Sequence, residues 1–157
     1  MEKDSIQKLI KLHNSLREQE SVNNANINDF FQGLRNLLET RLDLQEEVWV
    51  DFEINPAMRH EPVNIFGWGH TDSGWHVAVA QREEHRHSES EPVEVYGDTP
   101  KKGILDCSSS EKWIVFSNID LLFAEIQNHL TQRLRSEREI AEKINSRLEL
   151  LEKLLES

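Results

Sequence analysis

The feature that most constrains this chain is the apolar periodicity of its last third, which predicts one long helix from Asn118 to about Leu155. No Gly or Pro interrupts this stretch, and apolar residues recur every three or four positions, as on one side of a helix. Such a helix is roughly 54 Å long at 1.5 Å per residue, whereas a compact domain of the remaining residues has a radius of gyration of about 13 Å. We therefore expect its far end to overhang the domain.

An overhanging apolar seam needs a second helix to cover it. Beyond Leu134 the seam consists of Ala141, Ile144, Leu148, Leu151 and Leu155. Three-four spacing of this kind is typical of helices that pair as coiled coils, so these residues are predicted to form an oligomerisation segment. An alternative is that the first helix, with Ile6, Leu9 and Leu16, folds back antiparallel along residues 137–155 of the same chain. The sequence does not choose between the two.

The first forty residues predict two amphipathic helices. Apolar residues repeat with helical spacing over residues 3–20 and again from Asn28 through Leu38. Between them, residues 21–26 contain three asparagines, whose side chains compete for backbone hydrogen bonds and favour turns. We therefore expect a helical hairpin at the N-terminus.

The apolar period then changes to two, which predicts strands. The first is expected from Val48 to Ile54, the second over residues 63–69 and the third over residues 75–81, with Thr71-Asp72-Ser73-Gly74 as the turn between the last two. Short links make an antiparallel meander the simplest arrangement. Gly67 and Gly69 in the second strand predict a bulge or the close approach of another group.

After this sheet, Val93, Val95 and Tyr96 suggest a short edge strand. Ser108 with Glu111 fits a capping box that opens a short helix, although residues 111–116 fit a strand as well. The predicted class is therefore α+β: a three- to four-stranded antiparallel sheet against an N-terminal helical hairpin. Residues 1–117 are expected to form this domain, and residues 118–157 the long helix, beginning at Asn118 and Asp120 as possible caps.

Charge is distributed unevenly. The net charge is −11, and residues 39–98 hold fourteen acidic and four basic side chains. A negative field repels phosphate and anionic lipid, so direct binding of nucleic acid or membrane is disfavoured and a basic protein is the favoured partner. The alternative is that the charge serves solubility alone.

The cysteine count and the lengths of the apolar runs indicate the cellular compartment. One cysteine, no run of about 18 apolar residues and a charged first segment predict a soluble protein of the reducing cytoplasm.

No pattern of catalytic residues stands out. His70, His76 and Asp72 lie near one turn and carry groups that bind transition metals, but their spacing matches no metal-site signature. Cys107 is interpreted as a small buried hydrophobe, and Asp51 as part of the wet face of the first strand. We expect no catalytic site, metal or cofactor.

Two functional hypotheses follow. The first is a non-enzymatic acidic protein that self-associates through its C-terminal helix and binds a basic partner, as an inhibitor or regulator that mimics nucleic acid would. Its partner-binding residues are predicted to be Trp49, Asp51, Glu53, Glu83, Glu84, Glu89 and Glu91. The second is a small-molecule or metal-binding module with a pocket rimmed by Trp68, His70, Trp75 and His76. A purely structural role in a larger complex is a third possibility.

Overall fold

The chain folds into long helices and one small sheet, and the α+β class is confirmed. The computed structural model describes residues 2–52, 54, 63–82 and 100–157. In chain order the elements are α1 (Glu2–Asn36), the π-helical turn η1 (Leu37–Arg41), β1 (Val48–Val50), β2 (Val63–Thr71), β3 (Gly74–Arg82), β4 (Lys101–Gly103), the 3₁₀ turn η2 (Ile104–Asp106), α2 (Ser109–Ser117) and α3 (Ile119–Glu156).

The sheet is an antiparallel meander, as predicted. Its strand order is β1-β2-β3-β4, so each strand pairs with its neighbour in sequence. The turn between β2 and β3 falls where the sequence places it: Gly74 has φ +109°, and the Thr71 hydroxyl donates to the Gly74 carbonyl at 2.9 Å. That positive φ is accessible to glycine without a steric penalty.

The two edge strands differ from the predicted ones. β1 ends at Val50, and the chain returns to the sheet through a hydrogen bond from the Ile54 amide to the Asn64 carbonyl, at 2.8 Å. The fourth strand is Lys101–Gly103, which carries no alternating apolar pattern and was not predicted. The strand expected around Val93, Val95 and Tyr96 lies outside the described residues.

The predicted N-terminal helical hairpin is wrong, because α1 runs unbroken through residues 21–26. The turn preference of asparagine is worth under about 1 kcal/mol per residue and is readily overridden. Neither Gly nor Pro lies in this stretch, and the Gln19 side-chain amide donates to Asn23 at 2.9 Å along the helix surface. The next turns of α1 bury Ile27 and Phe31 in the core. This burial stabilises a continuous helix.

The core lies between the sheet and the inner halves of α1 and α3. Trp68 is fully buried at its centre, and its indole N–H donates to the Leu44 carbonyl at 2.8 Å, which satisfies the one polar atom of the ring. From α1 the core receives Ile27, Phe31 and Leu34, and from α3 it receives Ile119, Leu122 and Ile126.

The short helix α2 is confirmed, and so is its capping box. The Ser108 side chain accepts from the Glu111 amide, while the Glu111 carboxylate accepts from the Ser108 amide. Asn118 precedes α3 but does not cap it through its side chain, which donates to the Ile114 carbonyl at 2.8 Å instead.

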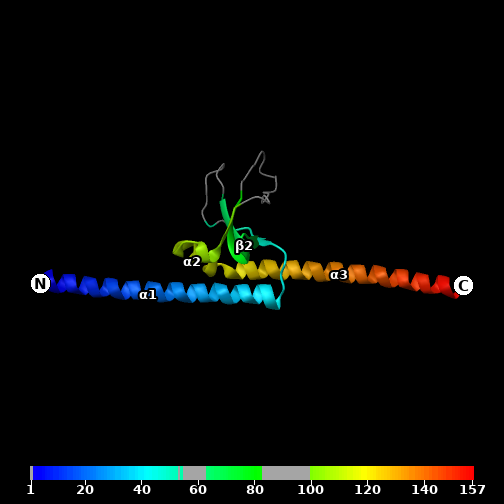
Figure 1. The fold of residues 1–157 in the computed structure, drawn as a ribbon, viewed down its shortest axis with the longest axis horizontal. Coiled ribbons are helices and arrows are strands. Elements are labelled where there is room, and N and C mark those ends of the chain that lie inside the picture. The colour runs from blue at the N-terminus through cyan, green and yellow to red at the C-terminus, as the bar shows by residue number, and fades with distance from the viewer. Residues whose placement is uncertain (1, 53, 55–62, 83–99) are drawn as a thin grey trace.

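The outer halves of α1 and α3 project from the sheet toward opposite ends of the molecule (Figure 1). The N-terminus lies at one end and the C-terminus at the other, with the sheet beside the middle of the molecule. The first helix therefore does not fold back along residues 137–155, and that alternative is wrong. It fails because α1 and α3 run in the same direction along the molecule.

Candidate functional site

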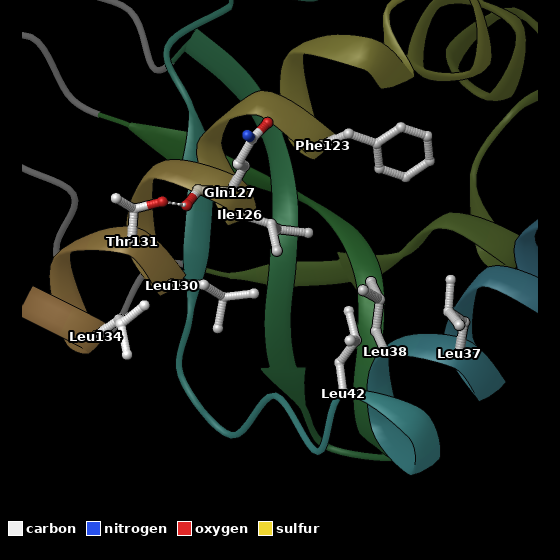
Figure 2. Close-up of a pocket in the computed structure, with 9 residues that line it drawn as sticks. All are labelled: Leu37, Leu38, Leu42, Phe123, Ile126, Gln127, Leu130, Thr131 and Leu134. Carbon is white, nitrogen blue, oxygen red and sulfur yellow. Dashed lines mark hydrogen bonds between the residues drawn. The ribbon is translucent and has the colours of Figure 1, made fainter. Parts of the chain in front are cut away.

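An apolar groove lies between the turn η1 and the inner half of α3 (Figure 2). It has a volume of about 410 Å³. Its walls are Leu37, Leu38 and Leu42 on one side and Phe123, Ile126, Gln127, Leu130, Thr131 and Leu134 on the other.

The wall from η1 depends on a local irregularity at the end of α1. The Leu42 amide bonds to the Leu37 carbonyl at 3.0 Å, which is the wider spacing of a π-turn, and the Leu44 amide bonds to the Leu38 carbonyl at 2.9 Å. Asp43 then takes a left-handed conformation with φ 45°, which aspartate tolerates better than most residues. The turn leaves Leu37 and Leu42 facing α3 with 46% and 44% of their surface exposed.

The groove offers almost nothing for a polar ligand to bind. Gln127 and Thr131 are the two polar residues among those lining it, and the Thr131 hydroxyl is already donating to the Gln127 main-chain carbonyl at 2.8 Å. Small-molecule sites usually combine apolar walls with a few converging polar groups. An apolar occupant, such as leucine side chains of another helix, suits this groove better.

The α3 wall of the groove continues outward as the predicted oligomerisation segment. We call this continuous row the α3 seam: Leu130, Leu134, Glu137, Ala141, Ile144, Leu148, Leu151 and Leu155. In the outer half Ile144, Leu148 and Leu151 are each about half exposed. No other part of the described chain covers these three side chains.

The outer half of α1 has a similar exposed row. Ile6, Leu9, Ile10, Leu12 and Leu16 are all more than half exposed. Up to Leu16, this row of α1 is about as apolar as the α3 seam. Beyond Leu16 the same side of α1 carries Glu20 and Asn23. The α3 seam is therefore the longer apolar surface.

An ion-pair cluster fixes α3 against the segment before β1. Glu46 binds His129 and also lies 3.4 Å from the Arg133 guanidinium. The hydrogen bond from His129, followed by the positive charge of Arg133, lowers the pKa of Glu46. These contacts join the inner half of α3 to the segment before β1.

Trp49, a predicted partner-binding residue, packs its ring over Gly67 and Gly69 of β2. A Cβ at Gly67 would stand 2.8 Å from its ring, and one at Gly69 would stand 2.7 Å from it. This is the close approach that the two glycines predicted. The ring is half-buried, and its N–H donates to Glu47 at 3.2 Å, so it covers the sheet in this structure.

Glu47 joins three parts of the sheet. Its carboxylate accepts from Trp49, from the His70 amide at 3.2 Å and from Lys101 of β4. Burial raises the pKa of Glu47, but the hydrogen bonds from Lys101, Trp49 and His70 outweigh burial and lower it overall. This residue, which sequence reasoning missed, ties both edge strands to the centre of the sheet.

The four residues of the alternative ligand pocket are divided between the two faces of the sheet. Trp68 stacks on Trp75 with ring centroids 5.8 Å apart, and His70 meets the Trp75 ring at 5.3 Å. Because His70 pairs with Trp75 across the hairpin, His76 falls on the opposite face. Its Nε2 lies 3.1 Å from the Ser73 hydroxyl. Burial, with the charge of Arg35, lowers the pKa of His76.

Two further candidate residues, Asp51 and Cys107, lie in the described part of the chain. Asp51 is exposed, whereas Glu53, Glu83, Glu84, Glu89 and Glu91 lie outside the described residues. Cys107 is buried, and burial raises its pKa to about 11. Within residues 2–52, 54, 63–82 and 100–157, no three His, Cys, Asp or Glu side chains are grouped so as to hold a metal ion.

Comparison with known proteins adds no further assignment: no family model, curated protein or solved structure gave a match. In the part of the chain that the structure describes, no helix combines the length and apolar character needed to cross a bilayer.

Proposed function

We propose that this chain is a non-enzymatic interaction protein that self-associates through the α3 seam and presents an acidic surface to a basic protein partner in the cytoplasm. The observation that supports self-association is the exposure of the seam, where Ile144, Leu148 and Leu151 are 50–52% exposed and no described part of the chain covers them. Monomeric proteins rarely leave a long contiguous apolar surface in water.

The energetics favour covering the seam. Fully burying a leucine or isoleucine side chain contributes about 1.5–3 kcal/mol, and the outer seam offers four such side chains, Ile144, Leu148, Leu151 and Leu155. Pairing two copies doubles that number. This gain opposes the entropic cost of association.

The basic partner is proposed from charge. Residues 39–98 carry the excess of acidic over basic side chains, whereas residues 1–38 carry five of each. A field concentrated in one segment steers a partner of opposite charge toward it. An inhibitor or regulator that occupies the basic site of a nucleic-acid-binding protein would have this charge distribution.

Self-association is tested by light scattering on the purified chain across a range of concentrations. We expect a mass that is a multiple of 18.4 kDa and that falls toward the single chain on dilution. A mass of 18.4 kDa at all concentrations up to the millimolar range would end this part of the proposal.

Partner binding is tested by capture from lysate of the source organism at increasing salt, followed by identification of the bound proteins. The variant carries Asp51→Lys, Glu53→Lys, Glu83→Lys and Glu84→Lys. Its matched control carries Glu2→Lys, Asp4→Lys, Glu18→Lys and Glu20→Lys in the outer half of α1. We expect the first set to abolish capture of basic proteins and the second to preserve it. Equal capture by both would refute the acidic surface.

A further inference from the structure

The groove and the α3 seam form one surface with a common spacing. Phe123, Gln127, Leu130 and Leu134 line the groove, and the same three-four spacing carries on to Glu137, Ala141 and beyond. A helix that packs along the outer seam in a straight line therefore enters the groove at its inner end.

We propose that the groove is filled by the C-terminal leucines of a second copy, whose α3 packs antiparallel along this one. The inference rests on the proposed self-association and adds its orientation, register and end contacts. By twofold symmetry each copy fills the groove of the other, so that the interface is closed and both grooves are covered at once.

The register follows from the positions of the seam residues. In coiled coils each seam side chain inserts between four residues of the facing helix, spaced i, i+3, i+4 and i+7. When Ala141 is set opposite Ile144 of the second copy, Leu134 faces Leu151 of the second copy, and Leu130 faces Leu155 of the second copy. The whole row from Leu130 to Leu155, about 38 Å long at 1.5 Å per residue, is then paired.

This register places Leu155 of the second copy in the groove. The four residues that surround it are Gln127, Leu130, Thr131 and Leu134, all of which line the groove. Leu151 of the second copy follows beside Leu134, which is 51% exposed in the single chain. Leu37 and Leu42 form the facing η1 wall of the groove, and Figure 2 shows Leu42 nearer to Leu130 and Leu37 toward Phe123.

Charge distinguishes this arrangement from a parallel dimer. Glu137 is the charged member of the seam. In a parallel dimer it faces Glu137 of the second copy, and two carboxylates in one layer repel. In the antiparallel register it lies beside Arg147 and Leu148 of the second copy, so the same residue gains an opposite charge. Symmetry repeats this pair.

The shape of the chain leaves room for this dimer. The outer half of α3 projects away from the sheet (Figure 1), so two antiparallel copies place their sheets at opposite ends of the shared helix pair. In an in-register parallel dimer, by contrast, the C-terminal leucines of both copies lie together at the far end of the helix pair and do not reach the groove.

The orientation is tested by disulfide trapping in a Cys107→Ala background. One chain carries Leu134→Cys, another carries Leu151→Cys with a mass tag, and the two are mixed before mild oxidation by oxidised glutathione. In the proposed register the two different chains cross-link, because their cysteines face each other. Like cysteines lie about 25 Å apart, which is beyond disulfide reach.

Cross-links between like chains would overturn the antiparallel register while leaving self-association intact. A chain that is monomeric by light scattering would overturn both proposals. Groove filling is tested separately by Leu37→Glu, with Leu9→Glu in the outer half of α1 as the matched control. We expect Leu37→Glu to raise the dimer dissociation constant by about tenfold or more, because a carboxylate is buried without a partner, and Leu9→Glu to leave it unchanged. Equal effects would show that the groove is not occupied.

Discussion

Ile126 and Ile144 lie on the same side of α3, about five turns apart, yet Ile126 is 5% exposed and Ile144 is 52% exposed. The inner residue is covered by the sheet of its own chain, and the outer one is covered by nothing in the described chain. The helix thus presents one continuous apolar side of which the chain itself buries only the first part. That difference is the reason to expect self-association through α3.

Replacing Leu148 by glutamate is expected to convert the dimer to a monomer. Leu148 belongs to the α3 seam, and a charge there would be buried against the second copy without a partner. Leu150 is the matched control, since it is 59% exposed on another side of the same helix. Light scattering should give the mass of one chain for Leu148→Glu and an unchanged mass for Leu150→Glu. If Leu150→Glu were equally disruptive, the seam would have been assigned to the wrong side.

Replacing Gly67 by alanine is expected to destabilise the fold by about 2–3 kcal/mol. The added Cβ would stand 2.1 Å from the Val48 carbonyl oxygen and 2.8 Å from the Trp49 ring, so β1 would have to move. Gly33 in α1 is the control, because nothing lies within 4 Å of its Cβ position and alanine in a helix gains about 0.5–1 kcal/mol. Urea unfolding should move the midpoint down for Gly67→Ala and up for Gly33→Ala. A tolerated Gly67→Ala would mean that Trp49 does not lie on this strand.

The sequence was sufficient for those elements whose signal is local. The unbroken period of α3, the turn at Gly74 and the Ser108 capping box each depend on residues within a few positions of one another, and each was predicted correctly. The asparagines of residues 21–26 led to a wrong prediction because their weak turn preference is outweighed by the burial of Ile27 and Phe31 in the following turns.

The groove and the Glu47 contacts escaped prediction for a related reason. Leu37 and Leu130 are separated in sequence by the whole sheet, and their proximity depends on how α3 packs. Glu47 contacts Lys101 of β4, a strand with no alternating apolar pattern. Contacts between residues that are far apart in the chain produce no local periodic pattern in a single sequence.

Cys107 is expected to react slowly with thiol reagents at neutral pH. It is 7% exposed, and burial, followed by the nearby carboxylate of Glu111, raises its pKa to about 11. Since the thiolate is the nucleophile, very little of the reactive form is present at pH 8. Labelling with a chromogenic disulfide reagent should be at least about tenfold slower in the folded protein than in urea. Equal rates would place the thiol at the surface.

Replacing Glu47 by glutamine is expected to lower stability at neutral pH by about 1 kcal/mol, since its side chain is 33% exposed and solvent weakens its ion pair with Lys101. In the folded chain the pKa of Glu47 lies below its ordinary value of 4.5. A carboxyl group of that kind stabilises the fold fully above the unfolded pKa, and this contribution is lost as pH falls through the lower, folded pKa. The free energy of unfolding should therefore differ between wild type and Glu47→Gln at pH 7, and the two curves should converge below about pH 4.

Glu18→Gln, an exposed position of α1, serves as the control and should follow the wild type throughout. A constant difference between wild type and Glu47→Gln at every pH would mean that the charge of Glu47 contributes nothing and that the loss comes from packing alone.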